Sequence, residues 1–161
     1  MYRKILTPQQ ATVKIKAYCA YQERCHSEVK EKLYSYGLHK AEVEQILSNL
    51  IADNYLNEER FAIQFAGGKF RMKHWGRKKI QYELQQKQVS TYCIKLALKS
   101  IEEESYKETL LKIATTKWEQ LAGEHHFTRQ AKLQAYLLQK GYESPYIAIT
   151  IQQLISTAKS K

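Results

Sequence analysis

The sequence has little glycine and proline and no long apolar run. Only 6 glycines and 2 prolines occur among 161 residues, so few turns are signalled and helices joined by short loops are expected. No stretch of about 18 consecutive apolar residues is present, which excludes a bilayer-spanning helix. Residues 1–22 also lack the continuous apolar core of a signal peptide. We therefore expect a protein without a membrane association.

Cysteine is scarce as well, and its pattern favours neither a disulfide framework nor a metal site. Cys19, Cys25 and Cys93 are odd in number and far apart, and neither they nor His125–His126 belong to a ligand set at zinc-finger spacing. No Cys–His–Asn pattern and no glycine-rich phosphate loop occur. We expect a protein that is not an enzyme, has no cofactor or metal, and keeps its thiols reduced in the cytoplasm.

Negative charge is missing from one segment of the chain. The sequence has 26 Lys and Arg against 16 Asp and Glu, a net charge of +10, which favours an anionic partner. No Asp or Glu occurs between Arg60 and Tyr82, although a solvated helix face normally mixes both signs. We interpret this segment, the basic block, as an anion-binding surface rather than a solubilising one. Its expected contact residues are Arg60, Lys69, Arg71, Lys73, Trp75, Arg77, Lys78, Lys79 and Tyr82.

The side chains of the basic block suit two kinds of contact. Its lysines and arginines can neutralise phosphates without reading a base sequence. Trp75 follows the first group of cations and allows two interpretations, because it can stack on a partner or cover the joint between two helices.

Caps and apolar spacing predict nine helices and essentially no strand. Thr7-Pro8-Gln9-Gln10 and Ser105-Tyr106-Lys107-Glu108 have capping-box patterns, and Ser144-Pro145 has a cap followed by proline. On the first helix, we expect Val13, Ala17, Ala20 and Tyr21 to face the core. The predicted helices span about 8–24, 28–36, 40–53, 58–73, 77–87, 91–103, 106–122, 128–140 and a ninth from residue 144.

The nine helices repeat in threes. When the repeats are aligned at offsets of 51 and 53 residues, apolar side chains match at three positions. The matched sets are Leu33/Leu84/Leu137, Val43/Ile94/Ile147 and Leu50/Ile101/Leu154. This pattern predicts an all-α, elongated, monomeric array of three three-helix repeats over residues 1–56, 57–104 (with the basic block) and 105–161.

The repeat spacing and two segments, residues 50–66 and 76–89, together resemble the RecX family, the bacterial regulators of the RecA recombinase. The first contains Tyr55-Leu56 followed by Arg60-Phe61-Ala62. The second contains Gly76, Ile80, Glu83, Leu84, Lys87 and Val89. The sequence departs from the family pattern at Asn57-Glu58, where two acidic residues are usual, and at Gln88, where glycine is frequent.

The resemblance implies a non-enzymatic protein that lies in the groove of the RecA–DNA filament and inhibits RecA. The basic block would then face RecA, or the phosphate backbone of single- or double-stranded DNA. Two alternatives remain open: a helix-turn-helix-like DNA-binding protein and a general protein-interaction module. The predicted sixth helix offers Lys95 and Lys99 but no Arg, Asn or Gln for bidentate base contacts, which disfavours sequence-specific reading.

Overall fold

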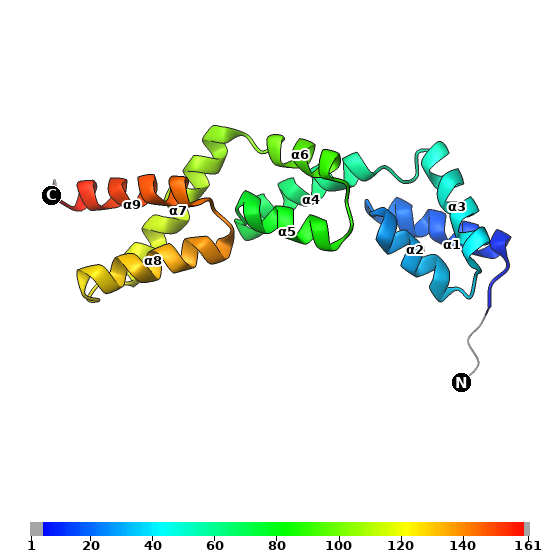
Figure 1. The fold of residues 1–161 in the computed structure, drawn as a ribbon, viewed down its shortest axis with the longest axis horizontal. Helices are drawn as coiled ribbons and strands as arrows, with labels where there is room; N and C mark the ends of the chain where they lie inside the picture. Colours follow the sequence, from blue (N-terminus) through cyan, green and yellow to red (C-terminus); the bar gives the residue numbers. More distant parts are fainter. Residues whose placement is uncertain (1–4, 160–161) are drawn as a thin grey trace. The chain divides into compact units, whose positions relative to one another are not determined.

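The computed structural model describes residues 5–159, and over this range it contains nine α-helices and no strand (Figure 1). The all-α prediction is therefore confirmed. Within the described residues, no helix has both the length and the apolar character needed to cross a bilayer. The helices are α1 (Pro8–Tyr21), α2 (His26–Ser35), α3 (Lys40–Ala52), α4 (Glu58–Lys73), α5 (Arg77–Gln86), α6 (Thr91–Lys99), α7 (Glu103–Gln120), α8 (His126–Lys140) and α9 (Ser144–Lys159).

The helix starts follow some of the predicted caps, but Ser144, a predicted cap, is already the first residue of α9. Thr7 and Gln10 form a reciprocal capping box at α1, and Asn57 Oδ1 accepts from the Arg60 amide at 2.8 Å at the start of α4. The predicted cap at Ser105 is wrong, because α7 already begins at Glu103. Acidic side chains in the first turn of α7 favour this earlier start, since they oppose the positive end of the helix dipole.

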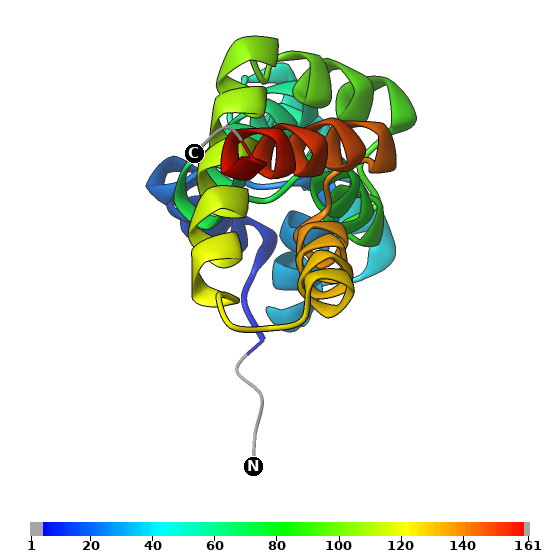
Figure 2. The same cartoon turned by 90° about the vertical axis from the view of Figure 1, so that its left-hand side faces the viewer.

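The chain forms two compact units. The first unit runs up to Phe65 and includes Leu84–Ala97, and the second comprises Ala66–Glu83 and the chain from Leu98 onward. In the first unit, helices α1, α2 and α3 pack against one another, and in the second unit α7, α8 and α9 do the same (Figures 1 and 2). The aligned repeat positions are at most 5% exposed, apart from Leu154, which is partly buried.

The buried face of α1 differs from the predicted one. Val13 is 71% exposed and Tyr21 is 84% exposed, whereas Ala11, Ile15 and Cys19 are buried in the core of the first repeat. Apolar side chains occur on both sides of this helix, so their spacing alone does not identify the side that meets α2 and α3.

Gln88, just after α5, has a strained backbone. Its φ is 62°, in the left-handed region that favours glycine. We expect Gln88→Gly to raise the free energy of unfolding by about 1 kcal/mol, since a side chain costs roughly that amount in this conformation. The measurement is urea unfolding followed by circular dichroism. Gln86→Gly, inside the last turn of α5, is the control and should lower stability by about 1 kcal/mol. A Gln88→Gly protein no more stable than the parent would contradict the prediction.

Candidate anion-binding surface

The second unit holds every predicted contact residue of the basic block except Arg60, which lies in the first unit. In the second unit, these residues come from the C-terminal half of α4, the following turn and α5. They are Lys69, Arg71 and Lys73 on α4, Trp75 in the turn, and Arg77, Lys78, Lys79 and Tyr82 on α5.

Arg60 is engaged within the first unit. Its Nε donates to Glu23 Oε1 at 2.5 Å, and its Nη atoms donate to the side-chain and backbone oxygens of Asn54 at 3.2 Å. The Glu23 carboxylate balances the charge of Arg60. The Arg60 guanidinium therefore links the start of α4 to the segment that follows α1. Counting charges along the sequence could not reveal this contact.

Arg77 is engaged in the same way within the second unit. Its Nη2 donates to Glu103 Oε2 at 3.0 Å and to the Ile101 carbonyl at 3.1 Å, and its Nη1 lies 3.9 Å from Glu143 Oε2. The guanidinium carbon also lies 4.0 Å from the centre of the Tyr106 ring. Burial alone would lower the pKa of Arg77, but the hydrogen bond and charge of Glu103 raise it.

Tyr106 connects this network to the core. The side chain is fully buried, and its hydroxyl accepts from the Arg77 amide at 2.9 Å and donates to Glu143 Oε1. Its ring centre lies 5.1 Å from that of Tyr142, whose hydroxyl donates to the His74 carbonyl at 2.9 Å. Burial raises the pKa of both tyrosines well above its ordinary value, so both hydroxyls remain hydrogen-bond donors.

A close backbone contact joins the turn before α5 to the end of α8. The Gly76 amide donates to the Lys140 carbonyl at 2.7 Å, and the Lys78 amide donates to the Gly141 carbonyl at 2.9 Å. A Cβ on Gly76 would lie 2.4 Å from the Gly141 carbonyl group. The first amides of α5 are therefore used inside the protein, and this helix terminus is not an open anion site.

Two of the remaining cations, Lys69 and Lys79, lie beside Trp75. Lys69 Nζ lies 5.1 Å and Lys79 Nζ lies 4.8 Å from the centre of the Trp75 ring, distances at which a ring attracts an ammonium group. The tryptophan is half-buried. Within residues 5–159, no carboxylate forms an ion pair with Arg71, Lys73, Lys78 or Lys79.

Three residues of the third repeat extend this surface and were missed from the sequence. Lys140 Nζ donates to the Lys73 carbonyl at 3.2 Å. Lys117 Nζ and Lys140 Nζ lie 5.0 and 5.9 Å from the centre of the Tyr136 ring. Only the fold brings Lys140 to α4, because the two lie 67 residues apart in sequence. We name the following set the lysine strip: Lys69, Lys73, Lys79, Lys117 and Lys140, with the rings of Trp75 and Tyr136.

The fold and this surface define a class, that of all-α proteins built from three-helix repeats with a cationic surface. Two family models match the chain: "RecX, second three-helix domain" over residues 57–98 and "RecX, third three-helix domain" over residues 103–148. The chain is 30% identical over 138 residues to a regulatory protein RecX of Chlorobium limicola, covering 83% of this chain and 84% of the relative. The chain belongs to the RecX family.

Other relatives agree with this assignment, and a solved structure has the same fold. The regulatory protein RecX of Chlorobium phaeobacteroides is 31% identical, with 82% of this chain and 86% of the relative covered. That of Oceanobacillus iheyensis is 26% identical, and the match covers 87% of this chain but only 52% of that longer protein. The crystal structure of RecX from Lactobacillus salivarius shares the fold, with a TM-score of 0.84 at 23% identity over 91% of this chain and 96% of that one.

Proposed function

We propose that this protein inhibits RecA by binding, as a monomer, in the groove of the RecA–DNA filament. Membership of a family of regulatory proteins supports a regulatory role. The observation that carries the proposal is that Arg71, Lys73, Lys78 and Lys79 form no ion pair with a carboxylate of the described chain. The contact set is narrower than the basic block, because Arg60 and Arg77 bind glutamates of the chain itself.

Inhibition of this kind requires no catalytic group. Each lysine contributes a weak ionic contact, and several contacts on one surface add up to appreciable binding that weakens as the salt concentration rises. The protein would act by occupying the groove and holding the filament in one state, so its effect depends on stoichiometry rather than turnover.

Reversal of the charges tests this proposal. We expect Lys73→Glu/Lys78→Glu/Lys79→Glu to raise the amount of protein needed to inhibit RecA strand exchange and filament ATPase by roughly tenfold or more, because three phosphate-type contacts are replaced by repulsion. Lys14→Glu/Lys30→Glu/Lys95→Glu is the matched control: these lysines are exposed in the first unit, and their reversal changes the net charge equally. Thermal unfolding of both variants verifies that they fold.

Two results would refute the proposal. If the parent protein at stoichiometric amounts leaves both RecA activities unchanged, the protein has no RecA-directed function. If the control variant loses inhibition as strongly as the test variant, total charge rather than this surface determines the effect.

A further inference from the structure

We propose that the lysine strip binds the backbone of a single nucleic-acid strand directly, and that Lys117, Tyr136 and Lys140 of the third repeat belong to that site. The inference rests on the proposed function in that it concerns the same surface, but it names the chemical partner and extends the site beyond the basic block. The partner is a phosphodiester strand rather than an acidic face of RecA.

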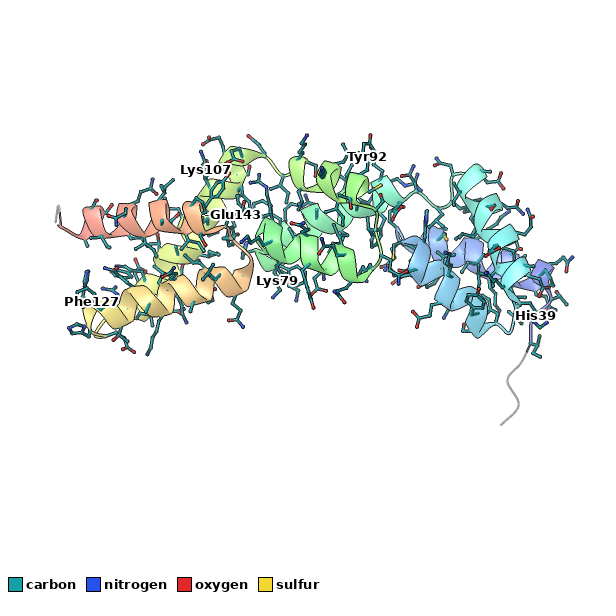
Figure 3. The ribbon with its side chains drawn as sticks, viewed as in Figure 1. His39, Lys79, Tyr92, Lys107, Phe127 and Glu143 are labelled. Carbon is teal, nitrogen blue, oxygen red and sulfur yellow. The ribbon has the colours of Figure 1, made fainter. Side chains whose placement is uncertain are left out.

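The strip is continuous within the second unit. Lys69 and Lys79 flank Trp75. A Cβ on Gly141 would lie 2.4 Å from Lys79 Cβ, so α5 directly abuts the residue that follows Lys140; Figure 3 labels Lys79 at this place. Lys140 in turn contacts α4 and the Tyr136 ring, with Lys117 on the same ring. Lysine ammonium groups and aromatic rings thus alternate along the surface, from Trp75 in the middle repeat to Tyr136 in the third.

The type of cation favours phosphate over protein carboxylates. Protein interfaces are enriched in arginine and depleted in lysine, and Arg60 and Arg77 are both engaged by glutamates of the chain. The strip consists of lysines, which act as compact point charges and bind phosphates without demanding a fixed geometry. Such contacts fix the position of a nucleic acid without reading its sequence.

The rings favour a single strand over a duplex. Unpaired bases stack on aromatic side chains, and alternation of rings with cations is typical of proteins that bind single strands without sequence preference. A duplex hides the faces of its bases, so Trp75 and Tyr136 would have no partner there. Both rings are only half-buried, which leaves part of each surface accessible.

Lys140 also has a structural contact, which the experiment must separate from binding. Its ammonium donates one hydrogen bond to the Lys73 carbonyl, at the end of α4, where a cation opposes the negative end of the helix dipole. An ammonium group has three donors, so this contact leaves two for a phosphate. Loss of the structural contact would lower the melting temperature, whereas loss of the phosphate contact would lower the salt dependence of binding.

The experiment measures binding of fluorescein-labelled oligo(dT) to the full chain by fluorescence anisotropy over a range of salt concentrations, without RecA. We expect Lys117→Gln/Lys140→Gln to reduce the slope of log K against log salt by about 1.4, since each contact to a single strand contributes about 0.7. Lys107→Gln/Lys112→Gln, exposed on α7 and outside the strip, is the matched control and should leave the slope unchanged. Melting temperatures are recorded for both variants.

A second pair of variants tests the role of the ring. Tyr136→Leu should weaken binding to the oligonucleotide by about fivefold or more, whereas Tyr136→Phe, which keeps the stacking face, should bind as the parent does. A labelled duplex of the same length should bind more weakly than the single strand and should not respond to Tyr136→Leu.

The outcomes separate this inference from the proposed function. A smaller slope for the strip variant alone, together with the loss for Tyr136→Leu, supports the inference. Equal slopes for all variants overturn it, as does a duplex that binds as tightly as the single strand. If the parent inhibits RecA but does not bind oligo(dT), the inference fails and the proposed function stands, with the strip then directed at an acidic surface of RecA.

Discussion

Substitution of Gly76 by alanine should lower the free energy of unfolding of the second unit by about 3–5 kcal/mol. The added Cβ would meet the carbonyl carbon and oxygen of Gly141 at 2.4 Å and the Tyr142 amide nitrogen at 2.5 Å. These are backbone atoms, which cannot rotate aside as a side chain can. Overpacking of this kind costs about 1–3 kcal/mol, and separation of the two turns also weakens the hydrogen bonds from Gly76 and Lys78, each worth about 1 kcal/mol.

The loss is measurable by thermal unfolding, with an expected drop of more than about 10 °C in the melting temperature. Both tryptophans of the chain, Trp75 and Trp118, lie in the second unit, so their fluorescence reports the unfolding of that unit alone. Gly68→Ala is the control: a Cβ there would have nothing within 4 Å, and alanine within α4 should add about 1 kcal/mol of stability. Equal melting temperatures for the Gly76→Ala and parent proteins would show that the two turns separate freely.

Arg77→Met should lower the free energy of unfolding by about 1–2 kcal/mol, since it removes hydrogen bonds made by a side chain that is only 17% exposed. Methionine is similarly long and unbranched, so the change chiefly removes the guanidinium. Glu103 and Glu143 would then lose their cation, and the Ile101 carbonyl would lose a hydrogen-bond donor. The Glu103 side chain is 46% exposed and that of Glu143 is 24% exposed, so water compensates for part of the loss.

The neighbouring Lys78 provides a control that also separates stability from binding. Lys78→Met changes an exposed side chain, so its effect on the free energy of unfolding should stay within about 0.5 kcal/mol. Urea unfolding followed by tryptophan fluorescence gives both values. If Arg77→Met kept its stability but lost inhibition of RecA, Arg77 would contact the partner, and its internal role described above would be incorrect.

Much of the fold could be predicted from the sequence, because caps and apolar spacing are local signals. Thr7 and Asn57 cap helices as expected, and the repeat alignment identified buried positions such as Leu33 and Leu137. The predicted buried face of α1 was wrong for a physical reason. Val13 and Ile15 are both apolar, and only the packing of α2 and α3 decides which is buried. The repeat boundaries at 56/57 and 104/105 stay a prediction.

The candidate site was less accessible from sequence, because charge acts through space. Glu23 lies 37 residues before Arg60, and Glu103 lies 26 residues after Arg77, so neither appears within the acid-free segment that defined the basic block. Lys140 is even more remote from Lys73, at 67 residues, and joins the surface only after folding. A run of like charge along the chain therefore identifies a candidate segment but does not tell which of its members are already engaged.

The joint at Gly76 and Gly141 is held by main-chain amides and carbonyls, which every substitution short of proline retains. The surrounding side chains can therefore change over evolutionary time without loosening the connection between the middle and third repeats, provided that both positions stay glycine. Selection can then adjust the charge and aromatic content of the neighbouring surface to a changing partner independently of the architecture that supports it.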